Sequence, residues 1–185
     1  MSHFEYVSVA LALLNALTVG LLLSSLTPVM DHERRYWVHA AWVFSLVLVA
    51  VLQWWSFWTW RQVVWSPIRF LWALSLPGLL FVQASVLVGE TGSVTSFRER
   101  FFERRIAFFS LGIALAANIA FGPWVLGLAR WLSLTPSHPV AATLLALSAA
   151  GIGFRTHLAH AIIASLAMAL AIASFLWLPV ATPAA

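Results

Sequence analysis

Three histidines at the ends of long apolar segments are the side chains of this sequence best suited to chemistry. His39 follows Arg34-Arg35 at the start of one such segment, and His157 and His160 lie in the first turns of the last one. Ionisable groups at membrane depth are costly and are therefore functional candidates. An imidazole changes charge near physiological pH and also ligates haem iron. We therefore predict that His39 and His160, with His157 nearby, form a protonatable or ligand-binding pair.

Two further polar residues are predicted to lie near these histidines. Gln83 is about one turn deeper in the apolar region, and Glu103 lies close to the same side. Since His157 and His160 are three residues apart, they share one helix face, so only His39 is placed to face them across a haem. We expect no cofactor and no metal site, and b-type haem is the alternative. Ordinary interfacial histidines are the structural alternative.

The motifs of common catalytic sites are absent from the sequence. It has no H-E-x-x-H, no G-x-S-x-G and no phosphate-binding glycine loop. Cysteine is also absent, which excludes thiolate catalysis and disulfides. We therefore assign no catalytic residues and expect that the protein is not an enzyme.

The composition is that of an integral membrane protein. Of the 185 residues, 62% are hydrophobic and 9% are charged, against roughly 25% charged in an ordinary soluble domain. Lysine is absent, so ten arginines supply all of the fixed positive charge. They lie at the ends of apolar runs, which is typical of orientation in a bilayer. The expected partner is therefore the lipid bilayer and not nucleic acid.

The apolar runs predict an all-α bundle of about six transmembrane helices in a single domain over residues 1–185. About 20 apolar residues cross the hydrocarbon core. A mixed aromatic and arginine segment before the fourth span is predicted to be an interfacial amphipathic helix, capped by Ser96 and Glu99. The predicted spans are residues 4–26, 36–60, 65–88, 105–122, 138–154 and 157–178.

Arginine counts predict that both termini lie outside. Seven arginines then fall on the inner side and three on the outer side, as the positive-inside rule requires. Indole rings prefer the headgroup boundary, so tryptophans on the outer side predict an interfacial belt. The inner arginines are 34, 35, 98, 100, 104, 105 and 155, and the outer ones are 61, 69 and 130. The belt comprises Trp54, Trp55, Trp58, Trp60, Trp65, Trp124, Trp131 and Trp177.

Four arginines of the predicted interfacial segment are candidates for contact with anionic lipid or another anion. Basic side chains beside a span are attracted to the anionic inner leaflet. These four residues are Arg98, Arg100, Arg104 and Arg105.

Small residues at helical spacing predict which faces of the helices pack together, because membrane helices approach closely through such residues. We expect the first, fourth, fifth and sixth spans to form the packed centre. The bulkier second and third spans are expected at the periphery. The predicted packing residues are Ala12, Ala16, Gly20, Gly112, Ala116 and Ala164.

Aromatic and arginine motifs along the chain resemble those of a group of uncharacterised bacterial multi-pass membrane proteins. The resemblance implies a bacterial inner-membrane location and brings no activity. It rests on Phe4-Glu5-Tyr6, Arg34-Arg35, Trp37, His39, Trp42, Gln53-Trp54-Trp55, Phe97-Arg98, Phe101-Phe102 and Arg104-Arg105.

The leading hypothesis for function is an oligomeric channel or small transporter, or an accessory subunit of one. A bundle of this size leaves little room for a wide path inside one chain. We therefore expect a homo-oligomer or a complex with other membrane subunits. The alternatives are a redox subunit that binds b-type haem and a structural membrane partner.

Overall fold

Residues 2–26, 36–89 and 97–181, which the computed structural model describes, form six α-helices and one short 3-10 helix and contain no strand. Side chains are described as far as Trp177. The predicted all-helical class is confirmed. The elements are α1 (His3–Ser24), α3 (Trp37–Ser56), η1 (Phe57–Gln62), α4 (Pro67–Val88), α5 (Phe97–Val125), α6 (Ser137–Gly153) and α7 (His157–Ala181).

Five of these helices are long and apolar enough to cross a membrane. The sixth, α6, has 17 residues, which at 1.5 Å per residue span roughly 26 Å of a hydrocarbon core about 30 Å thick. The sequence also predicts this span to be the shortest. The helices support a membrane location, and a full crossing by α6 stays a prediction.

The predicted interfacial segment is not a separate helix, because it forms the first turns of α5. Nothing between Phe97 and Ile106 breaks a helix, so α5 runs without interruption for 29 residues, or roughly 43 Å. Phe97 and Phe101 are buried on one side of this extension, whereas Arg98 and Arg104 are exposed on the other. The predicted cap at Ser96 lies outside the described residues. A capping box does occur at Ser2 and Glu5, at the start of α1.

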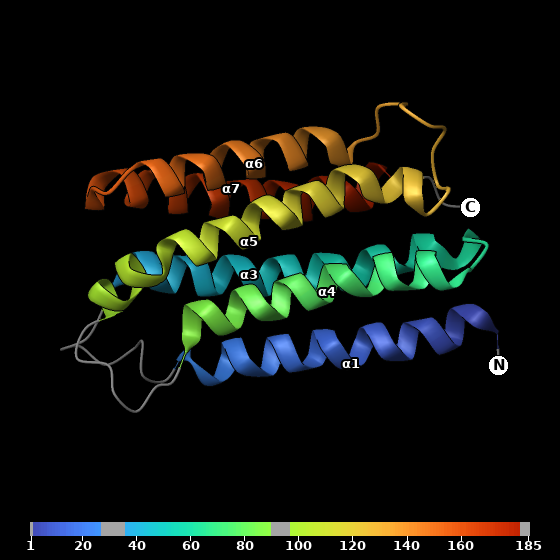
Figure 1. Cartoon of the computed structure of the whole chain (residues 1–185), viewed down its shortest axis with the longest axis horizontal. Helices are drawn as coiled ribbons and strands as arrows, with labels where there is room; N and C mark the ends of the chain where they lie inside the picture. The colour runs from blue at the N-terminus through green and yellow to red at the C-terminus, as the bar shows by residue number, and fades with distance from the viewer. Residues whose placement is uncertain (1, 27–35, 90–96, 182–185) are drawn as a thin grey trace.

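Five helices form a closed ring in the order α3, α4, α5, α6, α7, since each contacts the next and α7 contacts α3. Helix α1 lies outside the ring, against α3 and α4 (Figure 1). Consecutive described helices run antiparallel, whereas α3 and α7, which close the ring, run parallel, and the bundle has two ends. We call them the tryptophan end, where α1 begins and α7 ends, and the arginine end, where α5 and α7 begin.

The face by which α1 packs differs from the predicted one. Its buried residues are Val7, Leu11, Asn15, Thr18 and Leu22, and the Asn15 amide Nδ2 donates a 3.0 Å hydrogen bond to the Ala50 carbonyl of α3.

The predicted small residues of α1 face elsewhere, because Ala16 and Gly20 are exposed and a Cβ added at Gly20 meets no atom within 4 Å. Ala12 is half-buried. The stripe therefore does not mediate packing within one chain. The predicted small residues of the other helices, Gly112, Ala116 and Ala164, are buried.

Helices α3 and α4 are part of the ring, so the expectation that they are peripheral is wrong. Nine of the 20 residues of α3 are buried, among them Trp42 and Gln53. A large side chain on a membrane helix can fill the interior of a bundle as well as face lipid. The large side chains of α3 therefore did not indicate whether the helix lies in the ring or at its periphery. Pro77 lies inside a continuous α4.

Reporter fusions test the sidedness of the bundle. We expect a phosphatase that is active only outside the cytoplasm to be active at either terminus, because the arginine bias places both termini outside. The same enzyme fused in the α6–α7 turn, at Arg155, should be inactive. Active phosphatase in that turn together with inactive phosphatase at both termini would reverse the assigned orientation.

Candidate functional site

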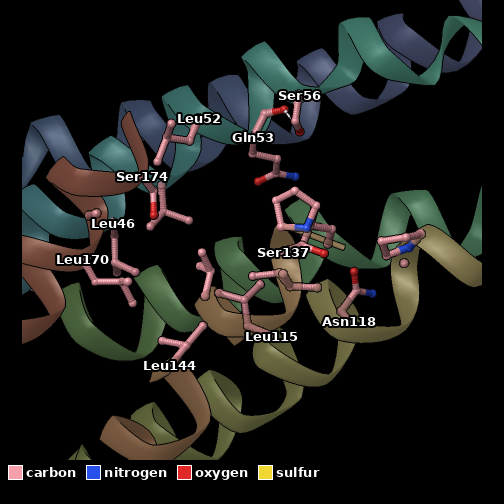
Figure 2. Close-up of a pocket in the computed structure, with 18 of the residues that line it drawn as sticks. Leu46, Leu52, Gln53, Ser56, Leu115, Asn118, Ser137, Leu144, Leu170 and Ser174 are labelled. Carbon is pink, nitrogen blue, oxygen red and sulfur yellow. Dashed lines mark hydrogen bonds between the residues drawn. The ribbon is translucent and has the colours of Figure 1, made fainter. Parts of the chain in front are cut away.

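A cavity of about 310 Å³ lies inside the ring and is lined by residues of all five ring helices. No described residue of α1 lines it. On each helix the lining residues recur at helical spacing and thus form one inward stripe. On α3 the stripe includes Ser45, Val49, Gln53 and Ser56, and Figure 2 shows Gln53 extending into the opening.

Polar side chains enter this cavity from opposite sides. Figure 2 shows Gln53 on α3 and Asn118 on α5 on opposite sides of the opening. The Asn118 Nδ2 donates a 2.6 Å hydrogen bond to the Ser75 Oγ. The Gln83 Nε2 donates a 3.2 Å hydrogen bond to the Phe108 carbonyl. These two hydrogen bonds hold both amides at the cavity wall.

Four buried polar atoms of the lining residues have no hydrogen-bond partner among the described residues. Three are donors, the indole Nε1 of Trp42, the indole Nε1 of Trp72 and the amide Nε2 of Gln53. The fourth is an acceptor, the Oε1 of Gln83. A buried polar group without a partner costs about 1–3 kcal/mol. All four atoms belong to residues that line the same cavity.

The cavity reaches the surface at the tryptophan end, where its lining includes the exposed residues Thr59, Leu128 and Pro136. At the arginine end the ring is filled by an aromatic cluster, which we define as Trp42, Phe101, Phe108, Phe109 and His160. Every member of this cluster is buried.

Ring contacts join α3 to α5 within the aromatic cluster. The Trp42 ring lies 5.0 Å from Phe108 and 5.5 Å from Phe109, both edge-on. The Phe109 ring stacks on His160 at 5.6 Å. The described helices therefore enclose a space that is open at one end and closed at the other.

The two predicted histidines are buried at the arginine end, at 1% exposure for His39 and 0% for His160. Their rings rest on different phenylalanines of α5, His39 on Phe97 at 4.9 Å and His160 on Phe101 at 5.2 Å. No hydrogen bond joins the two imidazoles among the described residues. Their pairing stays a prediction, and neither lines the cavity.

The orientation of His160 is set by a backbone hydrogen bond. Its Nε2 donates to the Phe154 carbonyl at 3.0 Å, so Nδ1 carries the lone pair of the neutral ring, and no described residue bonds to it. His157 is exposed and meets Tyr36 edge-on at 5.4 Å.

The other predicted site residues are spread over both ends of the bundle. Glu103 is exposed, and Gln83 is the one residue of the predicted site that lines the cavity. The Arg100 guanidinium lies against Gly89. Arg105 differs from Arg98 and Arg104 because it is buried.

The tryptophans predicted to form a belt divide into two groups. Five of them are exposed at the tryptophan end, as an interfacial belt requires, namely Trp54, Trp55, Trp58, Trp131 and Trp177. Trp60 is buried and lines the cavity. Trp65 is half-buried. Trp124 is also half-buried and donates from Nε1 to the Ser133 carbonyl at 3.0 Å.

Sequence reasoning missed Gln53 and Trp72 as site residues and gave Asn118 no role. One signal for Gln53 was available, since Ser45, Gln53 and Ser56 recur at helical spacing in an otherwise apolar run. Nothing comparable marks Trp72. Its position in the cavity follows from how α4 packs.

The described residues contain no group of three or more His, Asp or Glu side chains that could hold a metal ion. Comparisons with protein-family models, curated proteins and solved structures find no match to this chain.

Proposed function

We propose that this chain is a small membrane transporter, or the solute-binding subunit of one, whose solute occupies the cavity inside the ring. The observation that carries the proposal is an enclosed, mostly apolar cavity whose lining residues include four polar atoms without a partner among the described residues. Small-molecule sites are mostly apolar and carry a few polar groups that orient the ligand. This cavity matches that description.

The lining residues suggest the chemistry of the solute. None of the described residues that line the cavity is ionisable, and a charged solute would lose its hydration there without a counter-charge. Three unpaired donors against one unpaired acceptor favour a solute with an accepting oxygen. The volume of about 310 Å³ is about twice the roughly 150 Å³ of an apolar cavity that binds benzene. An uncharged molecule with a ring-sized apolar body and a carbonyl fits these constraints.

The closed arginine end favours a carrier over an open channel. A channel needs a path that reaches both ends, whereas the aromatic cluster fills this bundle at one end. Opening that end would require α3 and α5 to separate where Trp42 meets Phe108 and Phe109. The cavity lies within one chain, so transport along it does not require the predicted oligomer. The bacterial inner membrane, with both termini outside, is the proposed location.

The haem alternative gains no support from this geometry. Two axial imidazoles must face one shared space, but none of the described histidines lines the cavity. His39 and His160 instead rest on different phenylalanine rings.

A thermal unfolding assay with probes of matched size tests the proposal. We expect acetophenone and benzamide, which are uncharged and carry a carbonyl, to raise the unfolding midpoint of the purified protein. A ligand at 100 times its Kd stabilises the folded state by about 2.7 kcal/mol. Ethylbenzene lacks the acceptor and benzoate carries a charge, so both should stabilise less.

Two glutamine variants test whether the stabilising probe binds in the cavity. Gln53→Leu removes one unpaired donor and should abolish the advantage of acetophenone over ethylbenzene. Gln62→Leu changes an exposed glutamine outside the cavity and should preserve it. Equal stabilisation by all four probes, or none by any, contradicts the proposed solute class.

A further inference from the structure

The connection between α5 and α6, residues 126–136, exposes large apolar side chains at the tryptophan end. Leu134 is 86% exposed, and Trp131 and Leu132 are each 70% exposed. Apolar surface is unfavourable in water, and a cluster of such side chains marks a surface that contacts lipid or a partner. The connection therefore presents an interaction surface and not an ordinary solvated loop.

Hydrogen bonds hold this surface in a fixed shape. The Ser133 N–H donates to the Arg130 carbonyl at 3.0 Å and closes a turn, and the Trp124 Nε1 bond to the Ser133 carbonyl ties that turn to the end of α5. Leu132, the third residue of the turn, has a φ of 62°, which glycine or asparagine usually supplies. The backbone thus keeps an exposed leucine at a strained position.

The apolar surface of the connection continues the outward surface of α5. Phe121 on α5 is exposed, and its ring contacts Trp124 edge-on at 5.7 Å. The Trp124 ring in turn contacts Trp131 at 5.6 Å. The exposed Arg130 precedes Trp131, and arginine and tryptophan are both typical of the headgroup boundary. Lipid that surrounds α5 therefore covers the connection as well.

The length of α6 places the connection close to the hydrocarbon. The 17 residues of α6 span roughly 26 Å, which is roughly 4 Å less than the hydrocarbon core. Arg155 lies two residues after α6, whereas Arg130 lies seven residues before it, so the apolar residues that can make up the difference are those before Ser137. An irregular backbone needs polar partners. Its place is therefore among the headgroups, with the leucine side chains toward the acyl chains.

The cavity opens beside this connection. Leu128 and Pro136, near its two ends, are exposed and line the cavity. The third exposed lining residue, Thr59, belongs to η1 and follows the exposed Trp58. Residues suited to the lipid boundary thus lie next to the rim of the opening, both on the connection and on η1.

We propose that the cavity opens at the lipid boundary beside residues 126–136, so that its solute enters from the bilayer and not from water. This inference rests on the proposed transport and narrows its solute to molecules that partition into membranes. An uncharged molecule with an apolar body does so, because transfer of its surface out of water is favourable.

A spin label tests the lipid contact of the connection without any solute. The chain contains no cysteine, so Leu134→Cys provides a single site for a nitroxide on the full chain in liposomes. We expect this label to collide more with oxygen, which concentrates in lipid, than with a water-soluble nickel chelate. Glu103→Cys, at an exposed position of the arginine end, should show the reverse preference.

Two results of the label measurement contradict lipid contact. A label at residue 134 that prefers the nickel chelate lies in water, and one that neither reagent reaches is covered by protein, such as a second copy of this chain. Leu132→Cys is the second variant if Leu134→Cys does not fold.

Tethered probes test the route of the solute. Acetophenone is attached either to an acyl chain of phosphatidylcholine or to dextran, which cannot enter a bilayer, and each is added to the full chain in nanodiscs. We expect the lipid-bound probe to raise the unfolding midpoint by roughly 5–10 °C near saturation, as a ligand in large excess over its Kd does for a chain of this size. The dextran-bound probe should have no effect. Ala171→Phe, which places a ring in the cavity, should lose the response.

Free acetophenone separates this inference from the proposed transport. If the free probe does not stabilise the chain, the proposed solute class is contradicted and its entry route falls with it, while the spin label still decides the lipid contact. If the free probe stabilises the chain and the lipid-bound probe does not, the cavity binds solute and the lipid-facing opening is wrong. A response to the dextran-bound probe also contradicts that opening, because this probe reaches the cavity only from water.

Discussion

Replacing Gly151 with leucine is expected to lower the thermal unfolding midpoint by roughly 5–10 °C, because overpacking a tight contact costs about 1–3 kcal/mol or more. A Cβ added at Gly151 lies 2.5 Å from the ring of Phe109. That ring cannot move away easily, since it is 1% exposed and packs against Trp42, Phe108 and His160. The substitution therefore forces α5 and α6 apart where the aromatic cluster closes the ring. Thermal unfolding in detergent measures the effect.

Two other glycines serve as controls for this substitution. Gly153 lies two residues further along α6 and Gly20 lies on α1, and an added Cβ at either meets no atom within 4 Å. Gly153→Leu and Gly20→Leu should each shift the midpoint much less than Gly151→Leu. If Gly20→Leu is as damaging as Gly151→Leu, the small residues of α1 form an interface that a single chain does not contain.

Filling the cavity is expected to remove solute binding without unfolding the protein. Ala171 is 5% exposed and lines the cavity from α7, so a phenylalanine at this position would place its ring in the space proposed for the solute. We expect Ala171→Phe to lose the stabilisation by acetophenone and any acetophenone-competed flux into liposomes. Its own unfolding midpoint should stay near that of the wild type, because the new ring fills empty volume and gains dispersion contacts.

Ala173→Phe is the matched control, since Ala173 is exposed on the same helix and lies outside the cavity. It should bind acetophenone as the wild type does. Ser174→Leu narrows the same space by a smaller step and is the second test if Ala171→Phe does not fold. Wild-type binding by both cavity variants would show that the probe binds elsewhere.

The positions of the helices could be predicted from the local sequence. Long apolar runs, with proline, serine or glycine near their ends, predicted six spans whose bounds agree with α1, α3, α4, α6 and α7 to within a few residues. The helix of the fourth span, α5, begins at Phe97, eight residues before the predicted start of the span, because nothing in the charged segment breaks the helix. Antiparallel order followed from the short connections, which leave no room for a chain to return across the membrane.

The inward face of each helix was decided only by tertiary packing. In a soluble protein, the apolar face of a helix marks the side that is buried. A membrane helix carries no such mark, because lipid is as apolar as a protein core. The apolar sequence of α1 therefore did not indicate that Asn15 faces α3 while Gly20 faces outward. For the same reason Gln53 and Asn118, far apart in the sequence, were not predicted to share a cavity. The sequence determined the segments and their alternating direction, and the rotation of each helix about its axis required the packing of the whole ring.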